Sequence, residues 1–110
     1  MVAALALVGC GQKELSDADG RAVADAEGDL SFYCSPAFRD ESPGDHALFA
    51  RRAPAHVDRL IRLHRQDPDA VYRASSESER TMRVVLQNAV TNLRHCDRRL
   101  AGEVERELQR

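Results

Sequence analysis

The longest pattern of apolar residues lies in the C-terminal third of the chain. Its members recur in steps of three or four residues, which places them along one face of an α-helix. They are Met82, Leu86, Ala89, Leu93, Cys96, Leu100, Val104 and Leu108. Just before them, Ser76 and Glu79 have the spacing of a helix-capping box. The pattern predicts one amphipathic helix over residues 77–108, with the Cys96 side chain facing the other helices.

Two shorter helical patterns precede this one. The first predicts a helix over residues 17–34. The second predicts a helix over residues 46–66, kinked or split at Pro54, because a proline inside a helix cannot donate one backbone hydrogen bond. Residues 35–44 are rich in Pro, Gly, Asp and Ser and predict a loop. No segment alternates apolar and polar residues as a strand would. We therefore expect an all-α fold, a small bundle of three main helices.

The chain opens on an uncharged apolar run that ends in Leu7-Val8-Gly9-Cys10. This ending resembles the lipobox of bacterial lipoprotein signal peptides, in which an aliphatic residue and two small or aliphatic residues precede the cysteine that becomes lipidated. The resemblance covers only this segment. It implies a signal peptide over residues 1–9, lipidation of Cys10, a tether over residues 10–15 and a helical domain over residues 16–110. The resemblance also implies localisation in the cell envelope, with the domain facing the periplasm or the cell exterior. In a Gram-negative cell, the outer membrane is favoured.

The apolar run departs from a complete signal peptide in one respect. No Lys or Arg precedes it, whereas a secretory signal has a basic n-region. One explanation is that Met1 is not the true start and that a basic n-region lies upstream. The run is also too short for a transmembrane helix, which needs roughly 20 apolar residues.

Three other interpretations of this run stay open. Gly9-Cys10-Gly11 resembles a dinucleotide-binding turn, but Glu14 stands where that fingerprint needs its third glycine. The run also fits an ordinary buried strand or the start of a helix. Finally, it fits a secretory signal without lipidation.

The cysteine count supports export independently of the lipobox. The chain has three cysteines, Cys10, Cys34 and Cys96, and an odd number is unusual in a secreted protein. Lipidation of Cys10 leaves a pair that can be oxidised outside the cytoplasm. We therefore predict a Cys34–Cys96 disulfide, which would stabilise the fold by roughly 3–4 kcal/mol through the loop that it closes.

Charge is distributed unevenly along the chain. Residues 11–50 contain three basic and nine acidic side chains, whereas residues 51–110 contain thirteen arginines and nine acidic side chains. The two parts either pack against each other as opposite charges or mark an anionic partner. The outward face of the predicted 46–66 helix is the candidate binding surface, which we call the arginine face. Its members are Arg51, Arg52, Arg59, Arg62 and Arg65.

The arginine face fits an anionic lipid, a glycan or an acidic protein patch. The alternative is a solvated helix face that pairs partly with the acidic first helix. We expect no nucleic-acid partner, because an exported domain does not meet one and the aromatic residues needed for base stacking are not interleaved with the arginines.

No set of residues in the sequence predicts catalysis, a metal site or a cofactor. His56 and His64 are eight residues apart, about 12 Å along a helix, which is too far to share an ion. His95 and Cys96 are neighbours whose side chains diverge on a helix, and a bridged cysteine is no nucleophile. Glu103 and Glu107 lie among arginines and indicate a solvated, salt-bridged face.

We therefore expect a small non-enzymatic envelope lipoprotein with a scaffolding or binding role. One alternative is a periplasmic inhibitor or accessory subunit that binds an acidic partner through the arginine face. Another is a cytosolic helical protein whose start is simply apolar.

Overall fold

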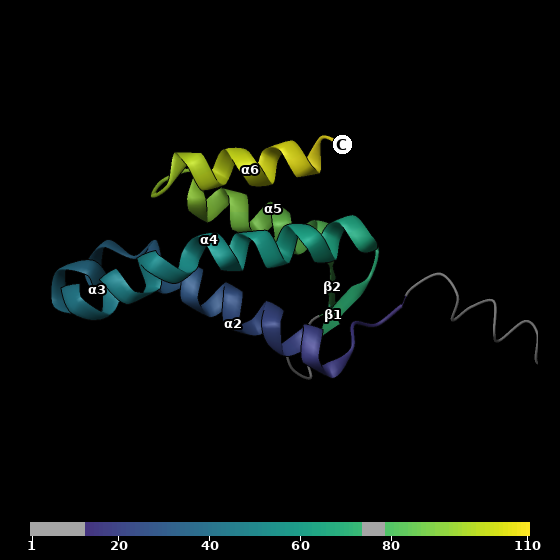
Figure 1. The fold of residues 1–110 in the computed structure, drawn as a ribbon, viewed down its shortest axis with the longest axis horizontal. Coiled ribbons are helices and arrows are strands. Elements are labelled where there is room, and N and C mark those ends of the chain that lie inside the picture. The colour runs from purple at the N-terminus through teal and green to yellow at the C-terminus, as the bar shows by residue number, and fades with distance from the viewer. Residues whose placement is uncertain (1–12, 74–78) are drawn as a thin grey trace, which may run out of the picture.

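The computed structural model describes residues 13–73 and 79–110. The element order is α2 (Asp17–Tyr33), α3 (Pro36–Glu41), α4 (Pro43–Gln66), β1 (Val71–Arg73), β2 (Glu79–Thr81), α5 (Met82–Leu93) and α6 (Arg98–Leu108) (Figure 1). The predicted signal peptide over residues 1–9, the lipidation site Cys10 and Ser76 of the predicted capping box lie outside the described residues. None of the helices in the described ranges is long and apolar enough to cross a membrane.

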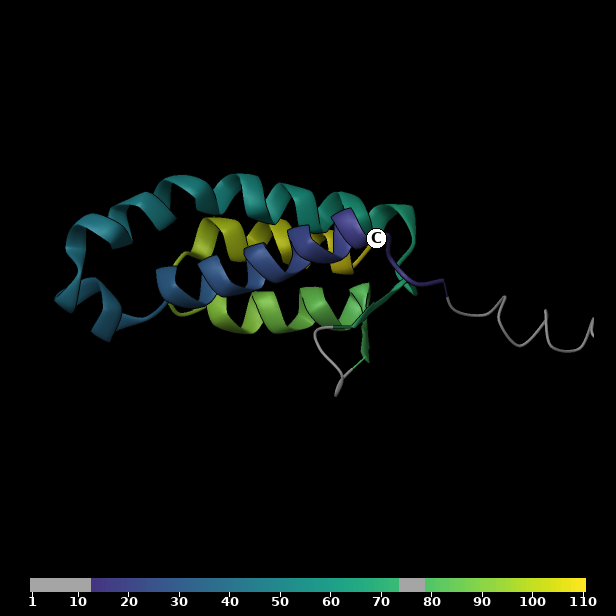
Figure 2. The same ribbon diagram turned by 90° about the horizontal axis from the view of Figure 1, so that it is seen from below.

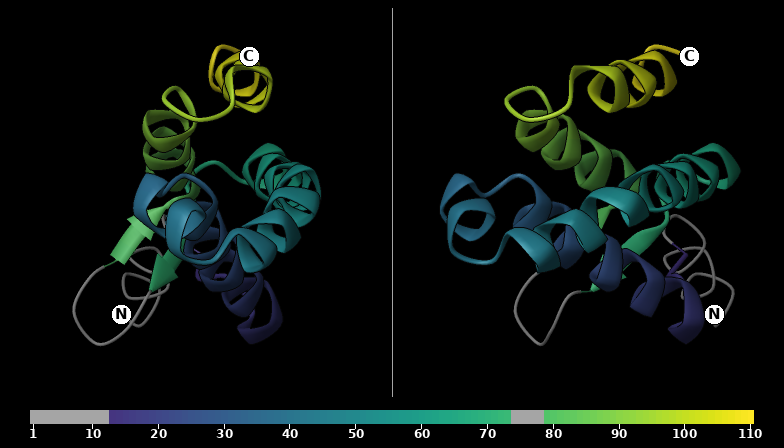
Figure 3. Two further views of the ribbon diagram at one scale, coloured as in Figure 1. Left: turned by 90° about the vertical axis from the view of Figure 1, so that its left-hand side faces the viewer. Right: turned by 60° about the vertical axis from the view of Figure 1, so that its left-hand side comes forward.

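The four longer helices lie side by side along the length of the molecule. Helix α2 packs on α4, α5 packs on α6, and α4 contacts both members of that second pair (Figures 2 and 3). The predicted helical character of the fold is confirmed, and so is the Cys34–Cys96 disulfide, which joins residues 62 positions apart. The predicted number of three main helices is not confirmed, because the described ranges contain four longer helices and the short helix α3. A short antiparallel pair of strands, β1 and β2, accompanies the helices and was not predicted.

The helix predicted over residues 17–34 agrees closely with α2. The helix predicted over residues 46–66 is one continuous helix, α4, which starts earlier at Pro43 and passes through Pro54. Pro54 lies on the exposed side of α4. There the carbonyl that its missing N–H leaves free can be hydrated, so the helix continues.

The loop predicted over residues 35–44 is wrong for most of its length, because it contains α3 and the start of α4. Pro36 and Pro43 occupy the first turns of these two helices. A helix does not use the N–H groups of its first turn, and a proline there has the right φ already. The prolines therefore begin helices here rather than excluding them. The Ser35 hydroxyl caps α3 by accepting from the Phe38 N–H.

The single helix predicted over residues 77–108 is also wrong. Residues 79–81 form strand β2, and a turn over residues 94–97 separates α5 from α6. Thr81 and Asp97 are the N-caps, each accepting from the backbone N–H three residues later. The apolar spacing continues on both sides of the turn because α5 and α6 pack against each other, and each helix buries its own part of the stripe. Cys96 lies in this turn and is exposed, instead of within the stripe.

The start of the described chain is held by backbone hydrogen bonds. The Leu15 N–H donates to the Val71 carbonyl over 3.0 Å, and the Val71 N–H donates to the Lys13 carbonyl over 2.8 Å. Leu15 packs on the core. Of the tether predicted over residues 10–15, the last three residues therefore run along β1 and are fixed to the domain.

The core is aliphatic, as the scarcity of aromatic residues requires. Its largest fully buried side chains come from α2, α4, α5 and α6. They are Val23, Val57, Leu60, Met82, Val85, Leu86, Leu93, Leu100 and Val104.

Candidate functional site

Two charged or polar side chains are buried where α4 and α6 meet. His64 lies in the last turn of α4 and is 6 % exposed, and Glu107 lies in the last turns of α6 and is 4 % exposed. Their Nδ1 and Oε2 atoms are 2.8 Å apart. Burying such a pair costs free energy unless other groups form hydrogen bonds with its remaining polar atoms.

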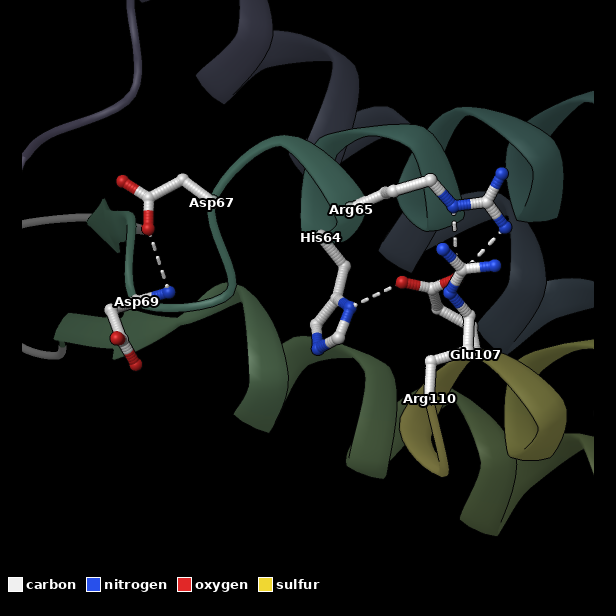
Figure 4. A network of polar contacts seen from close by, with 6 residues as sticks. All are labelled: His64, Arg65, Asp67, Asp69, Glu107 and Arg110. Atoms are coloured by element: carbon white, nitrogen blue, oxygen red, sulfur yellow. Dashed lines mark hydrogen bonds and ion pairs between the residues drawn. The ribbon is translucent and has the colours of Figure 1, made fainter.

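Two guanidinium groups complete the surroundings of the Glu107 carboxylate. Arg65 donates from Nε over 3.2 Å and from Nη2 over 2.9 Å to Oε1, and Arg110 Nε lies 3.5 Å from the same oxygen. Figure 4 shows His64 on one side of the carboxylate and the two arginines on the other. Asp67, which caps the end of α4, accepts from the Asp69 N–H and does not join this cluster.

The carboxylate of Glu107 is the charged form that this arrangement favours. Burial alone raises the pKa of Glu107, but hydrogen bonds from His64 and Arg65 and the charge of these groups outweigh it and hold the pKa below its ordinary value. His64 therefore donates through Nδ1. Its Nε2 atom is buried and has no hydrogen-bond partner among the residues that the structure describes.

Beside this cluster, α4 and α6 border an open hollow of about 430 Å³. Arginines from the last turns of both helices line it, together with carboxylates and one isoleucine. The lining residues are Asp58, Ile61, Arg62, Arg65, Glu103, Arg106, Glu107 and Arg110. Both oxygens of Glu107 are already occupied, so the carboxylate is not free to act as a base. The guanidinium groups, in contrast, retain unused donors and suit an anionic ligand.

The structure divides the predicted arginine face into two parts. Arg59 lies 3.2 Å from an Asp19 oxygen, Arg62 lies 3.2 Å from an Asp58 oxygen, and Arg65 binds Glu107. Arg51 and Arg52, in the first half of α4, are exposed, and neither forms an ion pair with any residue of the described ranges. The face is therefore not one uniform basic surface.

Opposite charges from the two halves of the chain do meet. Arg80 holds both oxygens of Glu27 at 2.7 and 2.8 Å, and His56 Nε2 lies 2.7 Å from an Asp29 oxygen. Together with the Arg59–Asp19 pair, these contacts connect the acidic helix α2 to the basic part of the chain. These contacts agree with the interpretation that the two oppositely charged parts of the chain pack against each other.

The disulfide end of the molecule carries a second polar group. The Tyr33 hydroxyl donates to Asp97 over 2.7 Å, beside the Cys34–Cys96 bridge, and His46 Nε2 donates to the Tyr33 carbonyl over 2.9 Å. Burial, the hydrogen bond to Asp97 and the negative charge of Asp97 raise the pKa of Tyr33 to about 12. A hollow of about 250 Å³ beside the bridge includes His46 and His95 in its lining.

Sequence reasoning placed Glu107 on a solvated face, and the structure shows instead that it is buried. Its position three residues after Val104 puts it beside the apolar stripe of α6, and this spacing was the one available signal. Arg106 and Arg110 are exposed beside Glu107 and line the hollow. No group of three or more potential metal ligands occurs within residues 13–73 and 79–110.

No family model, no curated protein and no solved structure matches this chain.

Proposed function

We propose that this chain is a small lipoprotein of the bacterial cell envelope, anchored through a lipid on Cys10, with a non-enzymatic binding or scaffolding role. The observation that carries the proposal is the pairing of Cys34 with Cys96. This pairing leaves Cys10 as the unpaired cysteine, directly after Leu7-Val8-Gly9. A disulfide of this kind is typical of oxidising compartments, which agrees with export. A non-enzymatic role agrees with the occupied state of Glu107, the most buried carboxylate of the described residues.

The test is mass spectrometry of the intact protein from the membrane fraction of its native host. We expect a mature chain that begins at Cys10, carries a thioether-linked lipid on that cysteine and lacks residues 1–9. A Cys10→Ala variant should carry no lipid and should no longer be found in the membrane fraction. Retention of Met1, or an unmodified Cys10 in the mature wild type, would contradict the proposal.

The same experiment separates the remaining alternatives. A secretory protein without a lipid would be cleaved and unmodified. A cytosolic helical protein would keep Met1 and contain three reduced thiols, which thiol-specific alkylation before lysis detects. The lipoprotein contains no free thiol once Cys10 is modified and the Cys34–Cys96 bridge is formed.

A second candidate is an accessory subunit or inhibitor that holds an acidic partner. It is favoured by Arg51 and Arg52, whose exposed charges have no ion-pair partner on the described chain. Charge reversal at both positions should remove the partner from a cross-linked envelope preparation. Reversal of Arg59 and Arg62, which are already paired, should weaken capture less. An unchanged set of cross-linked proteins in both variants would exclude this candidate.

A further inference from the structure

We infer that the hollow between α4 and α6 binds the phosphate group of an anionic phospholipid. This inference deepens the proposed function and rests on it, because the lipid anchor is what would bring the domain to a membrane. The arginines of the hollow, the buried His64–Glu107 pair beside them and their position in the fold support the inference.

The arginines of the hollow have N–H groups that are not used in hydrogen bonds within the described structure. A guanidinium has five N–H groups. Arg65 uses only its Nε and Nη2 atoms on Glu107 and keeps 52 % of its side chain exposed. Arg110 is 59 % exposed, and Arg106 has no ion pair within the described ranges. Arg62 is 61 % exposed; its Nε is paired with Asp58, and its two Nη groups remain as donors. Planar forks of this kind match phosphate oxygens in pairs.

Two of these arginines are held in place by the buried Glu107 carboxylate. Glu107 draws Arg65 and Arg110 to the same oxygen, so their side chains lose freedom before any ligand arrives. His64 holds Glu107 by a hydrogen bond to the other oxygen of its carboxylate. A ligand that meets arginines already held in place loses less conformational entropy on binding. The buried pair thus acts as a positioning device for the basic lining.

The hollow lies at the end of the molecule where the described chain begins. Arg62 and Arg65 lie in the last turns of α4, and Arg106 and Arg110 lie at the end of α6. The described chain begins at that same end of the molecule, where Lys13 and Leu15 bond to Val71, just after α4 (Figure 1). A lipid on Cys10 would therefore bring this end of the bundle toward the bilayer. Basic side chains near an anionic surface are attracted to it electrostatically, in addition to the anchor.

The experiment measures vesicle binding by the full chain carrying Cys10→Ala, so that no lipid anchor contributes. Vesicles of phosphatidylcholine with phosphatidylglycerol are compared with vesicles of phosphatidylcholine alone. In this background, Arg62→Gln/Arg106→Gln removes two charges from the hollow without touching a Glu107 contact. Arg51→Gln/Arg52→Gln is the matched control, because it removes two exposed charges from the other half of α4.

We expect the wild-type surface to bind the anionic vesicles in preference to phosphatidylcholine. Arg62→Gln/Arg106→Gln should weaken that binding about thirty-fold, since each basic side chain near an anionic surface contributes about five-fold. The control should change it by less than about two-fold. Equal loss in both variants would overturn the inference in favour of general charge attraction, and no loss in either would overturn it outright.

Inorganic phosphate, added at constant ionic strength, separates the two sources of a phosphate group. Binding of inorganic phosphate that Arg62→Gln/Arg106→Gln removes, in a protein that does not bind the anionic vesicles, would overturn the lipid assignment and leave a site for a free anion. Vesicle binding that the same variant weakens supports the lipid. Lipidation of Cys10 is tested separately by mass spectrometry, so failure of one claim is distinguishable from failure of the other.

Discussion

At the scale of single residues, the most informative group is the buried pair of His64 and Glu107. A carboxylate this deep in a small helical domain is stable only because three side chains donate to it or lie beside it. Removing the carboxylate would leave His64 buried without a partner, with both of its ring nitrogens unsatisfied within the described structure.

We expect Glu107→Gln to lower the free energy of unfolding by about 3 kcal/mol at neutral pH, because it removes one charge of a buried pair. Urea denaturation measures the change. Glu103→Gln, on the same helix, is the control and should change stability by less than about 0.5 kcal/mol. A Glu107→Gln protein as stable as the wild type would contradict the importance of the pair.

The same residue predicts an acid dependence of stability. The folded-state pKa of Glu107 lies below its ordinary value of 4.5. Its stabilisation is therefore complete above that value and is lost as pH falls through the lowered pKa. Denaturation curves of wild type and Glu107→Gln should converge as the pH falls below 4.5. Curves that remain parallel throughout this range would refute the assignment.

Tyr33 predicts the opposite dependence at alkaline pH. Its pKa is raised from 10.0 to about 12 by burial and by Asp97, so the folded state retains the phenolic proton longer than the unfolded chain. The resulting stabilisation is present below pH 10 and is lost as pH rises through the folded pKa. Tyrosinate absorbance should report this late ionisation in wild type, and its amplitude should fall in Tyr33→Phe, where only Tyr72, whose pKa burial also raises, remains. Ionisation of Tyr33 near pH 10 in the folded protein would contradict the prediction.

At the scale of elements, the prolines show how position decides their effect. Pro36 and Pro43 stand in first turns and begin helices, whereas Pro54 lies inside α4 and only removes one hydrogen bond. Composition treats the three alike, which is why residues 35–44 were predicted as a loop. The break between α5 and α6 was missed for a related reason, because an aspartate cap at Asp97 is weak evidence beside a continuous apolar stripe.

We expect Pro54→Ala to raise the free energy of unfolding by about 1–3 kcal/mol, because the new N–H can donate to the Ala50 carbonyl within α4. Pro43→Ala, in the first turn, should change stability by less than about 0.5 kcal/mol. Thermal and urea denaturation of the two variants measure the difference. Equal effects at both positions would show that the helical position of the proline does not matter here.

At the scale of the whole molecule, the disulfide connects the end of α2 to the turn between α5 and α6. It therefore joins the first helix of the described chain to the C-terminal helix pair. Polar contacts connect α2 to other elements: Arg59 and His56 belong to α4, and Arg80 belongs to β2. The disulfide and the polar contacts thus attach α2 to different parts of the fold.

We expect reduction of the Cys34–Cys96 bridge to lower the free energy of unfolding by about 4 kcal/mol, from the entropy of the loop that it closes. Urea denaturation with and without a reducing agent measures the loss. A Cys34→Ser/Cys96→Ser variant should match the reduced wild type and should not respond to the reducing agent. A reductant effect of equal size in that variant would show that another cause is responsible.

The sequence by itself determined the helical character of the chain, the extent of α2 and the pairing of its two domain cysteines. Each follows from local spacing or from counting, which needs no knowledge of neighbours in space. Only the tertiary structure decided where the long C-terminal pattern breaks, which arginines are paired and that Glu107 is buried. Those outcomes depend on contacts between residues such as His64 and Glu107, 43 positions apart. The free energy of a buried charge is set by the groups that the fold brings to it, and no local pattern contains that information.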